Sequence, residues 1–142
     1  MTYLQPAIDA ALPMLRAEAE ARMTSRCTIR RKTGNMVLDA DNQQVPEWEI
    51  IHTDLPCRIA SNPGATRSRT QSPGDIEIER ATPRLDFPAS TSNLADNDHV
   101  EIDSGENAGR VYRLVESDWS DQATARRCPV MAVERPIEWG AP

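Results

Sequence analysis

The N-terminal segment, from Pro6 to about Arg26, carries apolar residues at helical spacing. Alanines within it, among them Ala10, Ala11, Ala17, Ala19 and Ala21, raise its intrinsic helix propensity. Pro13 removes a backbone donor in mid-pattern, so we expect it to kink or divide the helix. The pattern predicts one helix that either lies on its own domain or docks on a neighbouring subunit. Its apolar stripe, with steps of three or four residues, consists of Leu4, Ile8, Leu12, Leu15, Ala19 and Met23.

From Cys27 onward the apolar period becomes that of a β-strand. In two of the segments, apolar residues alternate with acidic ones, which is typical of a strand with one wet and one packed face. Residues 104–109 supply Gly and Asn for a hairpin loop. Because no helix-length pattern separates the strands, they predict a mainly β fold, a small antiparallel β-barrel or sandwich. The expected strands are Cys27–Lys32, Trp48–Thr53, Pro56–Ala60, Asp75–Arg80, Asp98–Asp103, Val111–Glu116 and Ala125–Glu134.

Two stretches lack a regular apolar pattern. Residues 61–74 contain no large apolar side chain and have a Pro-Gly pair near each end. They predict a long polar loop, and connections of this length tend to be functional or disordered. Residues 88–97 form a second polar connector. Within the first, Arg67, Ser68, Arg69 and Thr70 are the candidates for contact with a partner.

The chain length of 142 residues fits one domain, with the helix at 1–26, the barrel at 27–135 and a short tail at 136–142. Its core-forming residues are scarce, since Leu, Ile, Val and Phe make up 25 of the 142. A domain with so thin a core gains from burial against neighbours, and folding only on partner contact is the alternative. The candidates for packing or assembly are Leu12, Leu15, Met23 and Trp48.

The net charge of −6 argues against a general nucleic-acid binder, because phosphate neutralisation needs a basic face. Residues 1–71 carry a net +1 and residues 72–142 a net −7. Of the 16 basic residues, 15 are Arg and only Lys32 is Lys.

Cys27, Cys57 and Cys128 are far apart and odd in number, which predicts buried thiols rather than a disulfide framework or a zinc site. The N-terminus does not resemble a signal peptide. No stretch approaches the ~18 apolar residues of a membrane span. We therefore expect a protein made in the cytoplasm and kept in aqueous solution, with no membrane partner.

The sequence favours no catalytic function and no cofactor. An acidic run near residue 100 is the best metal candidate, yet Glu101 occupies the position where an EF-hand needs Gly. A solvated strand face explains the run better than a metal site. His52 and His99 are the only histidines, and no nucleophile motif accompanies them. The run comprises Asp96, Asp98, His99, Glu101, Asp103 and Glu106.

The order of these segments resembles that of the head-to-tail stopper proteins of tailed phages, in particular of phages that infect actinobacteria. The similarity runs from the N-terminal helix to Glu134 and consists of strand, turn and hydrophobicity patterns rather than catalytic residues. The segments that carry it after the helix are Cys27–Arg31, Leu55–Ile59, Ile76–Ile78, Arg84–Pro88, Asp98–Ile102 and Gly109–Val115.

The resemblance implies a virion protein of the phage neck. Such a protein forms a homo-oligomeric ring, six- or twelve-fold, below the portal and adaptor, and presents a platform to the tail terminator and tail tube. It closes the DNA channel without sequence-specific binding, and a long loop between early barrel strands points toward the lumen. Residues 61–74 occupy the matching place here.

Other functions stay open at this stage. A tail terminator or another head-tail joining ring would share the barrel and copurify with free tails. A binding domain unrelated to phage would remain monomeric. An enzyme would show a metal or substrate dependence that follows Asp98, His99 or Glu101.

Overall fold

The computed structural model describes residues 4–72, 76–117 and 124–140. It begins with helix α1 (Leu4–Ala21), which continues through Pro13 rather than being divided there. The chain then leaves helical geometry, and strand β1 starts at Ser25, so the helix ends earlier than the expected Arg26. Met23, the last member of the apolar stripe, lies in this short link and is buried.

Within the described residues, six antiparallel strands form a closed barrel in the order β1-β2-β3-β6-β5-β4. The expected mainly β fold with an N-terminal helix is thereby confirmed. A short 3-10 helix, η1 (Ile137–Trp139), follows the last strand. The strands are β1 (Ser25–Leu38), β2 (Gln44–Ser72), β3 (Ile76–Pro88), β4 (His99–Ile102), β5 (Val111–Leu114) and β6 (Ala125–Val133).

The barrel interior holds small and medium side chains and two aromatic rings, those of Phe87 and Tyr112. The three cysteines are free thiols and belong to this core, as expected from their spacing. Burial and a hydrogen bond with Cys57 raise the pKa of the Cys27 thiol. The core comprises Cys27, Ile29, Cys57, Leu85, Phe87, Val100, Ile102, Tyr112, Leu114, Cys128 and Val130.

The β4–β5 hairpin confirms the loop that Gly and Asn predicted at residues 104–109. His99 pairs with Arg113 and Glu101 pairs with Val111 on either side of it. Gly105 has a φ of 94°, and a Cβ atom there would lie 2.7 Å from the hydroxyl oxygen of Ser25. The left-handed backbone conformation therefore favours glycine, and any other residue would also displace the Ser25 hydroxyl.

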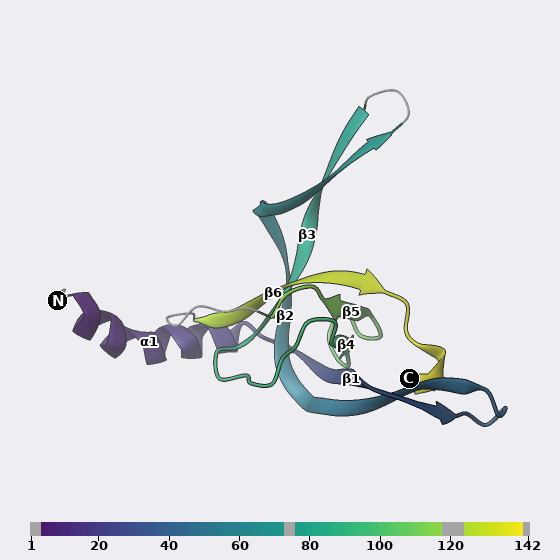
Figure 1. The fold of residues 1–142 in the computed structure, drawn as a ribbon. Helices are drawn as coiled ribbons and strands as arrows, with labels where there is room; N and C mark the ends of the chain where they lie inside the picture. The colour runs from purple at the N-terminus through teal and green to yellow at the C-terminus, as the bar shows by residue number, and fades with distance from the viewer. Residues whose placement is uncertain (1–3, 73–75, 118–123, 141–142) are drawn as a thin grey trace.

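The β2–β3 hairpin extends far beyond the barrel (Figure 1). Near its base, β3 pairs with β2 on one side and with β6 on the other, the last β6 pair being Arg84 with Pro129. From Pro83 outward, β3 pairs with β2 alone. We call this two-stranded projection, residues 61–82, the arm.

The prediction of an irregular loop over residues 61–74 was wrong for Ser61–Ser72, which are part of β2. The pairs run from Ser61 with Pro83 to Ser72 with Ile76, interrupted by one irregularity between Asn62 and Arg67. Residues 73 and 74 lie outside the described part of the chain. The loop prediction failed because it relied on the absence of large apolar residues. A ribbon outside the barrel needs no apolar face, since backbone hydrogen bonds hold its two strands together.

The β1–β2 hairpin also projects from the barrel, on the side opposite α1 (Figure 1). β1 pairs with β4 only as far as Arg30, whereas its pairs with β2 continue to Leu38. At its end, the Asp39 carboxylate accepts hydrogen bonds from the backbone N–H groups of Asp41 and Gln43, each at 2.9 Å. This side-chain cap gives the hairpin a defined turn.

Candidate functional site

The partner-contact candidates Arg67, Ser68, Arg69 and Thr70 all lie on the outer half of the arm. Their backbone pairs place Arg67 opposite Ala81 and Thr70 opposite Ile78. They sit on an ordered ribbon that the barrel holds at one end only, rather than on an irregular loop. The structure therefore keeps the four residues together, at a distance from the barrel core (Figure 1).

The base of the arm is anchored by buried residues of β3. Leu85 and Phe87 are fully buried in the core. Between them, the Asp86 carboxylate receives the Arg84 guanidinium at 2.7 Å and 3.1 Å, in a two-point ion pair. The arm is therefore fixed to the barrel at its base, whereas its outer strands pair only with each other.

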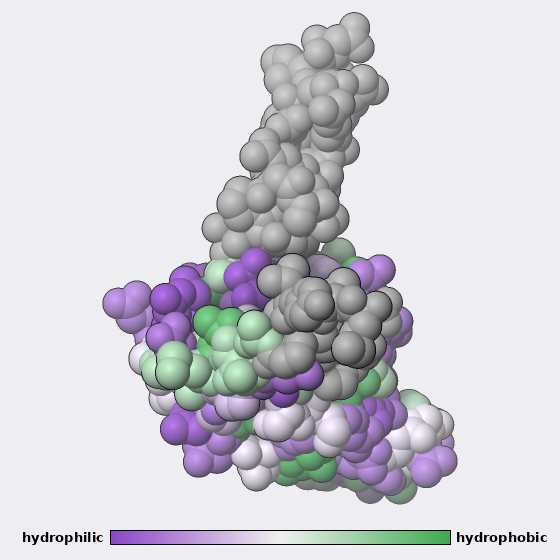
Figure 2. All heavy atoms as spheres, turned by 90° about the vertical axis from the view of Figure 1, so that its left-hand side faces the viewer, coloured by the Kyte–Doolittle hydropathy of each residue, from purple (hydrophilic) through white to green (hydrophobic). Residues whose placement is uncertain are grey.

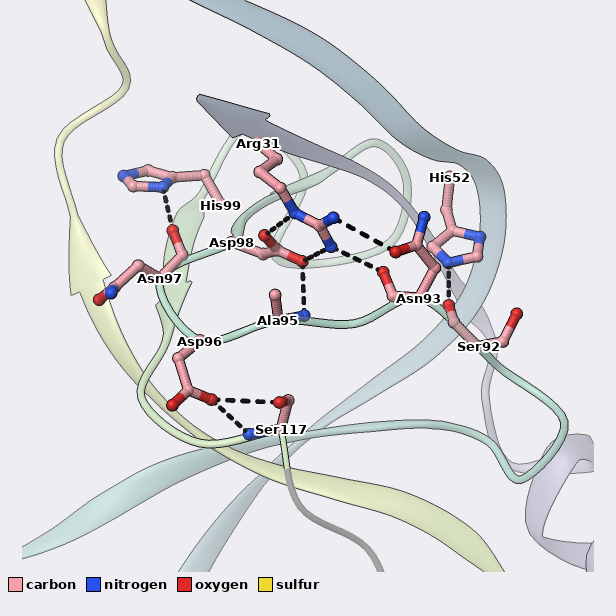
Figure 3. Close-up of polar contacts among 10 residues, drawn as sticks. All are labelled: Arg31, His52, Ser92, Asn93, Ala95, Asp96, Asn97, Asp98, His99 and Ser117. Atoms are coloured by element: carbon pink, nitrogen blue, oxygen red, sulfur yellow. Dashed lines mark hydrogen bonds and ion pairs between the residues drawn. The ribbon is translucent and has the colours of Figure 1, made fainter. Parts of the chain in front are cut away.

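The second polar connector, predicted at residues 88–97, spans residues 89–98 between β3 and β4. A buried carboxylate fastens it to the barrel (Figure 3). Asp98 is fully buried, and Arg31 donates to both of its oxygens, at 2.7 Å and 2.9 Å. The same carboxylate accepts the backbone N–H of Ala95 at 2.9 Å. Arg31 also donates to the backbone carbonyl of Asn93 at 2.8 Å. The hydrogen bonds with Asp98 raise the pKa of Arg31, so the guanidinium stays charged.

Both histidines contribute to the same connector. His52 donates from Nε2 to the carbonyl of Ser92 at 2.6 Å, and His99 donates from Nδ1 to the carbonyl of Asn97 at 3.0 Å. Figure 3 shows the two rings on opposite sides of the Asp98 cluster. Burial lowers the pKa of His99, with lesser contributions from Lys32 and Arg113. These bonds give both rings a structural role in holding the loop.

The acidic run is only partly solvated: Asp96, Asp103 and Glu106 are exposed, whereas Asp98 and Glu101 are buried. Glu101, expected on a solvated face, is only 6% exposed and receives Arg30 at 2.8 Å and Arg135 at 2.7 Å. Asp96 accepts two hydrogen bonds from Ser117. Among the residues that the structure describes, no three potential ligands are grouped to hold a metal ion.

Trp48, an assembly candidate, lies in an aromatic cluster of its own chain. Its ring centroid is 5.1 Å from that of Trp139 and 4.8 Å from that of His99, both edge to face. Its indole N–H donates to Glu138 at 2.9 Å. The Arg30 guanidinium lies 4.5 Å from the centroid of Trp139. The cluster fastens η1 to the barrel, so Trp48 serves internal packing.

The three candidates from the N-terminal stripe have different surroundings. Met23 is buried under the barrel, whereas Leu12 is half-buried and Leu15 is 45% exposed. Met14, beside them on α1, is 70% exposed. Figure 2, which faces this side of the molecule, shows apolar surface lying between charged groups. Of the three, Leu15 has the most surface free for a partner.

Sequence reasoning missed the end of the β1–β2 hairpin as an exposed apolar surface. Met36 and Leu38 of β1 are 54% and 64% exposed, and Ile50 of β2 is 57% exposed. The available signal was the run Met36-Val37-Leu38 just before the Asp39 turn, which continues the strand beyond the expected Lys32.

Over residues 4–72, 76–117 and 124–140, no helix is both long enough and apolar enough to cross a bilayer.

Comparison with known proteins assigns the chain to a family. A family of unknown function, DUF6093, matches residues 15–131, so the chain belongs to it. The match begins within α1 and ends in β6, and so spans the whole barrel and the arm. No curated protein and no solved structure matches the chain.

Proposed function

We propose that this member of the DUF6093 family is a structural subunit of the neck of a tailed phage, of the head-to-tail stopper type. It forms a ring below the portal and adaptor, and its arm, residues 61–82, extends into the DNA channel. The observation that carries the proposal is the arm itself, a two-stranded ribbon that its own barrel supports only at the base.

The arm favours an assembly function because of its energetics. An isolated two-stranded hairpin is marginally stable in water, so a projecting one gains its lasting geometry from contacts with other chains. Beyond Pro83 its strand β3 pairs with β2 alone, so a small push bends the arm more readily than it would deform the closed barrel. A ring of such arms narrows a channel and swings aside when DNA moves or a tail docks.

The polar groups of the described barrel support a structural rather than a catalytic function. The buried carboxylates Asp98 and Glu101 are each held by arginine guanidinium groups, and each histidine donates from one ring nitrogen to a backbone carbonyl of the connector. These bonds fix the positions of the four side chains and account for them as parts of the fold.

The overall charge is compatible with DNA that passes without binding. With a net charge of −6, the chain repels a phosphate backbone rather than displacing the counterions bound to it. The acidic excess lies in residues 72–142, which include β3, the returning strand of the arm. The proposal therefore needs no sequence-specific contact to DNA, only a lumen wall that DNA slides past.

The register of the arm provides a sharp test. Asn62 pairs with Thr82, so residues 63–81 can be replaced by a two-residue Asn-Gly turn that closes the hairpin at that pair. DNA-filled heads assembled without the chain would receive either the full chain or this short-arm variant. We expect the full chain to retain DNA and allow tail joining, and the short-arm variant to join tails but leak DNA.

Equal DNA retention by both proteins would overturn the gating role of the arm. A control that changes an exposed residue away from the arm is Ile137→Ser on η1, which should behave as the full chain does. If the chain copurifies with free tails and never with portal-containing heads, the tail-terminator alternative replaces the stopper.

A further inference from the structure

We propose that Cys27 and Cys57 form a redox-active pair, which closes to an intramolecular disulfide bond when the protein meets a peroxide. The bond ties β1 to β2 inside the barrel. Both residues are free thiols in the structure, which therefore shows the reduced state of the pair. The inference goes beyond the proposed function and holds whether or not the chain is a subunit of a phage neck.

The register of β1 and β2 makes the two cysteines neighbours. Cys57 pairs with Ser25 and Cys27 pairs with Leu55, so the cysteines are diagonal to each other on adjacent strands. Both side chains are fully buried in the same core cluster, and so they lie on the same, inner face of the strand pair. A hydrogen bond joins the two thiols, which places the sulfur atoms in contact before any oxidation.

Cys128 provides a comparison within the same core. It is also fully buried, and it belongs to the same cluster. It lies on β6, which pairs with β3 and β5, and its register partner is Leu85. Cys128 is thus a buried thiol on a strand that neighbours neither β1 nor β2, whereas Cys27 and Cys57 face each other across one strand pair.

The hydrogen bond between the thiols determines which of them reacts first. The thiolate is the nucleophilic form of cysteine. The bond that Cys27 donates lowers the pKa of the Cys57 thiol; burial and Asp103 oppose this effect, and the Arg26 charge adds to it. The same bond raises the pKa of Cys27. Cys57 is therefore the attacking thiol, and Cys27 is the one that resolves the intermediate.

The oxidant must be small, because both thiols are buried. Ser25, the register partner of Cys57, and Arg58, the next residue in the chain, line a hollow of about 340 Å³. Thr24 and Gly105 also line it, so it lies between the link after α1 and the loop that joins β4 to β5. We expect hydrogen peroxide to reach Cys57 by a local opening of the strand pair beside this hollow.

The reaction balances with one peroxide for each disulfide. The Cys57 thiolate attacks one peroxide oxygen, the O–O bond breaks, and hydroxide leaves and takes up the proton that Cys57 released. The Cys27 sulfur then attacks the sulfur of the resulting sulfenic acid, an S–S bond forms, and the S–O bond breaks. The hydroxyl group leaves as water with the Cys27 proton. Two thiols are oxidised, and one hydrogen peroxide molecule is reduced to two water molecules.

The disulfide should stabilise the folded barrel. It closes a loop of 31 residues, from Cys27 to Cys57, and thereby restricts the unfolded chain. It also lies where β2 changes partners, since Cys57 pairs with β1 and Arg58 is the first residue that pairs with β3. We expect the melting temperature to rise by about 10 °C on oxidation.

The test treats the purified, reduced full chain with hydrogen peroxide and then alkylates the free thiols in denaturant. Intact-mass spectrometry counts the alkylated thiols, and a tryptic digest without reduction locates the disulfide. Cys57→Ser removes the attacking thiol. Cys128→Ser makes the same substitution at an equally buried position of the same core and is the matched control.

The expected result identifies the pair directly. The parent and Cys128→Ser each lose about 2 Da, the mass of two hydrogen atoms, and dithiothreitol reverses the change. The digest contains residues 27–30 linked to residues 33–58, which hold Cys27 and Cys57 respectively. In the parent, Cys128 is the thiol that remains open to alkylation. Cys57→Ser forms no intramolecular disulfide.

Other outcomes would overturn the inference. They are a parent whose three thiols all stay alkylatable after peroxide, a linked peptide that contains Cys128, and oxidation of Cys57 to the sulfinic acid without a disulfide. A disulfide that forms but lowers the melting temperature would contradict the stabilising role. The parent alone decides each of these, so the test does not depend on the folding of Cys57→Ser.

Discussion

At the residue scale, Asp98 links three parts of the chain that are distant in sequence. Its carboxylate holds the Arg31 side chain of β1 and the backbone of Ala95 in the connector. Its own backbone carbonyl accepts the N–H of Leu114 in β5. A buried charge is stable only when it is paired and hydrogen-bonded, and Asp98 satisfies both conditions.

We expect Asp98→Asn to lower the free energy of unfolding by about 2–4 kcal/mol, because the amide leaves the Arg31 charge without its partner. The amide NH2 group would also face one of the donors that the carboxylate now accepts. Urea denaturation of both proteins measures the difference. Asp41→Asn, in the exposed hairpin turn, is the matched control and should stay within about 0.5 kcal/mol of the parent. A loss below 1 kcal/mol for Asp98→Asn would show that the ion pair does not fasten the connector.

Because the Cys128 thiol is buried, we expect the free energy of unfolding to fall at alkaline pH. Burial raises the pKa of this thiol from 9.0 to about 11. The folded state therefore holds the proton that the unfolded state releases. Its contribution is intact below pH 9 and is lost as pH rises toward 11, by about 2–3 kcal/mol in total.

The measurement is the free energy of unfolding between pH 8 and pH 11 for the parent and for Cys128→Ala. Taking the difference between the two curves cancels the titration of Cys27, Cys57 and the surface groups. We expect the gap between parent and variant to narrow as the pH rises above 9. Parallel curves would mean that the Cys128 thiol ionises equally in the folded and unfolded states.

At the element scale, the apolar periodicity predicted the barrel strands well where both barrel neighbours are present. The alternation of Val100 and Ile102 with charged residues predicted β4, and the core contains both. The helix was also predicted, although its end lies at Ala21 because the strand geometry of β1 begins at Ser25. In these segments, the apolar positions alternate because every second side chain is buried in the barrel.

Periodicity failed where strands leave the barrel. Ser61–Ser72 and Met36–Leu38 are strands because of a partner strand, and neither segment has an interior face that would enforce alternation. Glu101 was expected in solvent for a related reason. Its two partners, Arg30 and Arg135, come from distant parts of the chain, and only the closed barrel brings them together. The projections and the ion-pair network therefore could not be predicted from local sequence.

The arm should be dispensable for the fold. We expect replacement of residues 63–81 by Asn-Gly to change the free energy of unfolding by less than about 1 kcal/mol, because an isolated hairpin is only marginally stable. Thermal unfolding followed by circular dichroism measures this. Phe87→Ala, at the buried base of the same hairpin, is the contrasting variant and should cost about 3–5 kcal/mol. A short-arm variant as unstable as Phe87→Ala would mean that the arm is an integral part of the folded domain.

At the scale of the whole molecule, a small barrel carries three projections that its own core does not cover. α1, the β1–β2 hairpin and the arm leave the barrel in different directions (Figure 1). In the ring that we propose, the arm faces the channel and contacts between copies bury part of what the single barrel leaves exposed. The proposal thereby accounts for the scarcity of core-forming residues.

The central claim, that this chain is a ring subunit, is tested most directly by imaging and weighing the purified full chain. Negative-stain electron microscopy and native mass spectrometry of the same sample should show closed rings with a central lumen, whose mass is a whole multiple of 15.8 kDa. A sample that remains a 15.8 kDa monomer at every concentration, with no ring in the images, would contradict the account.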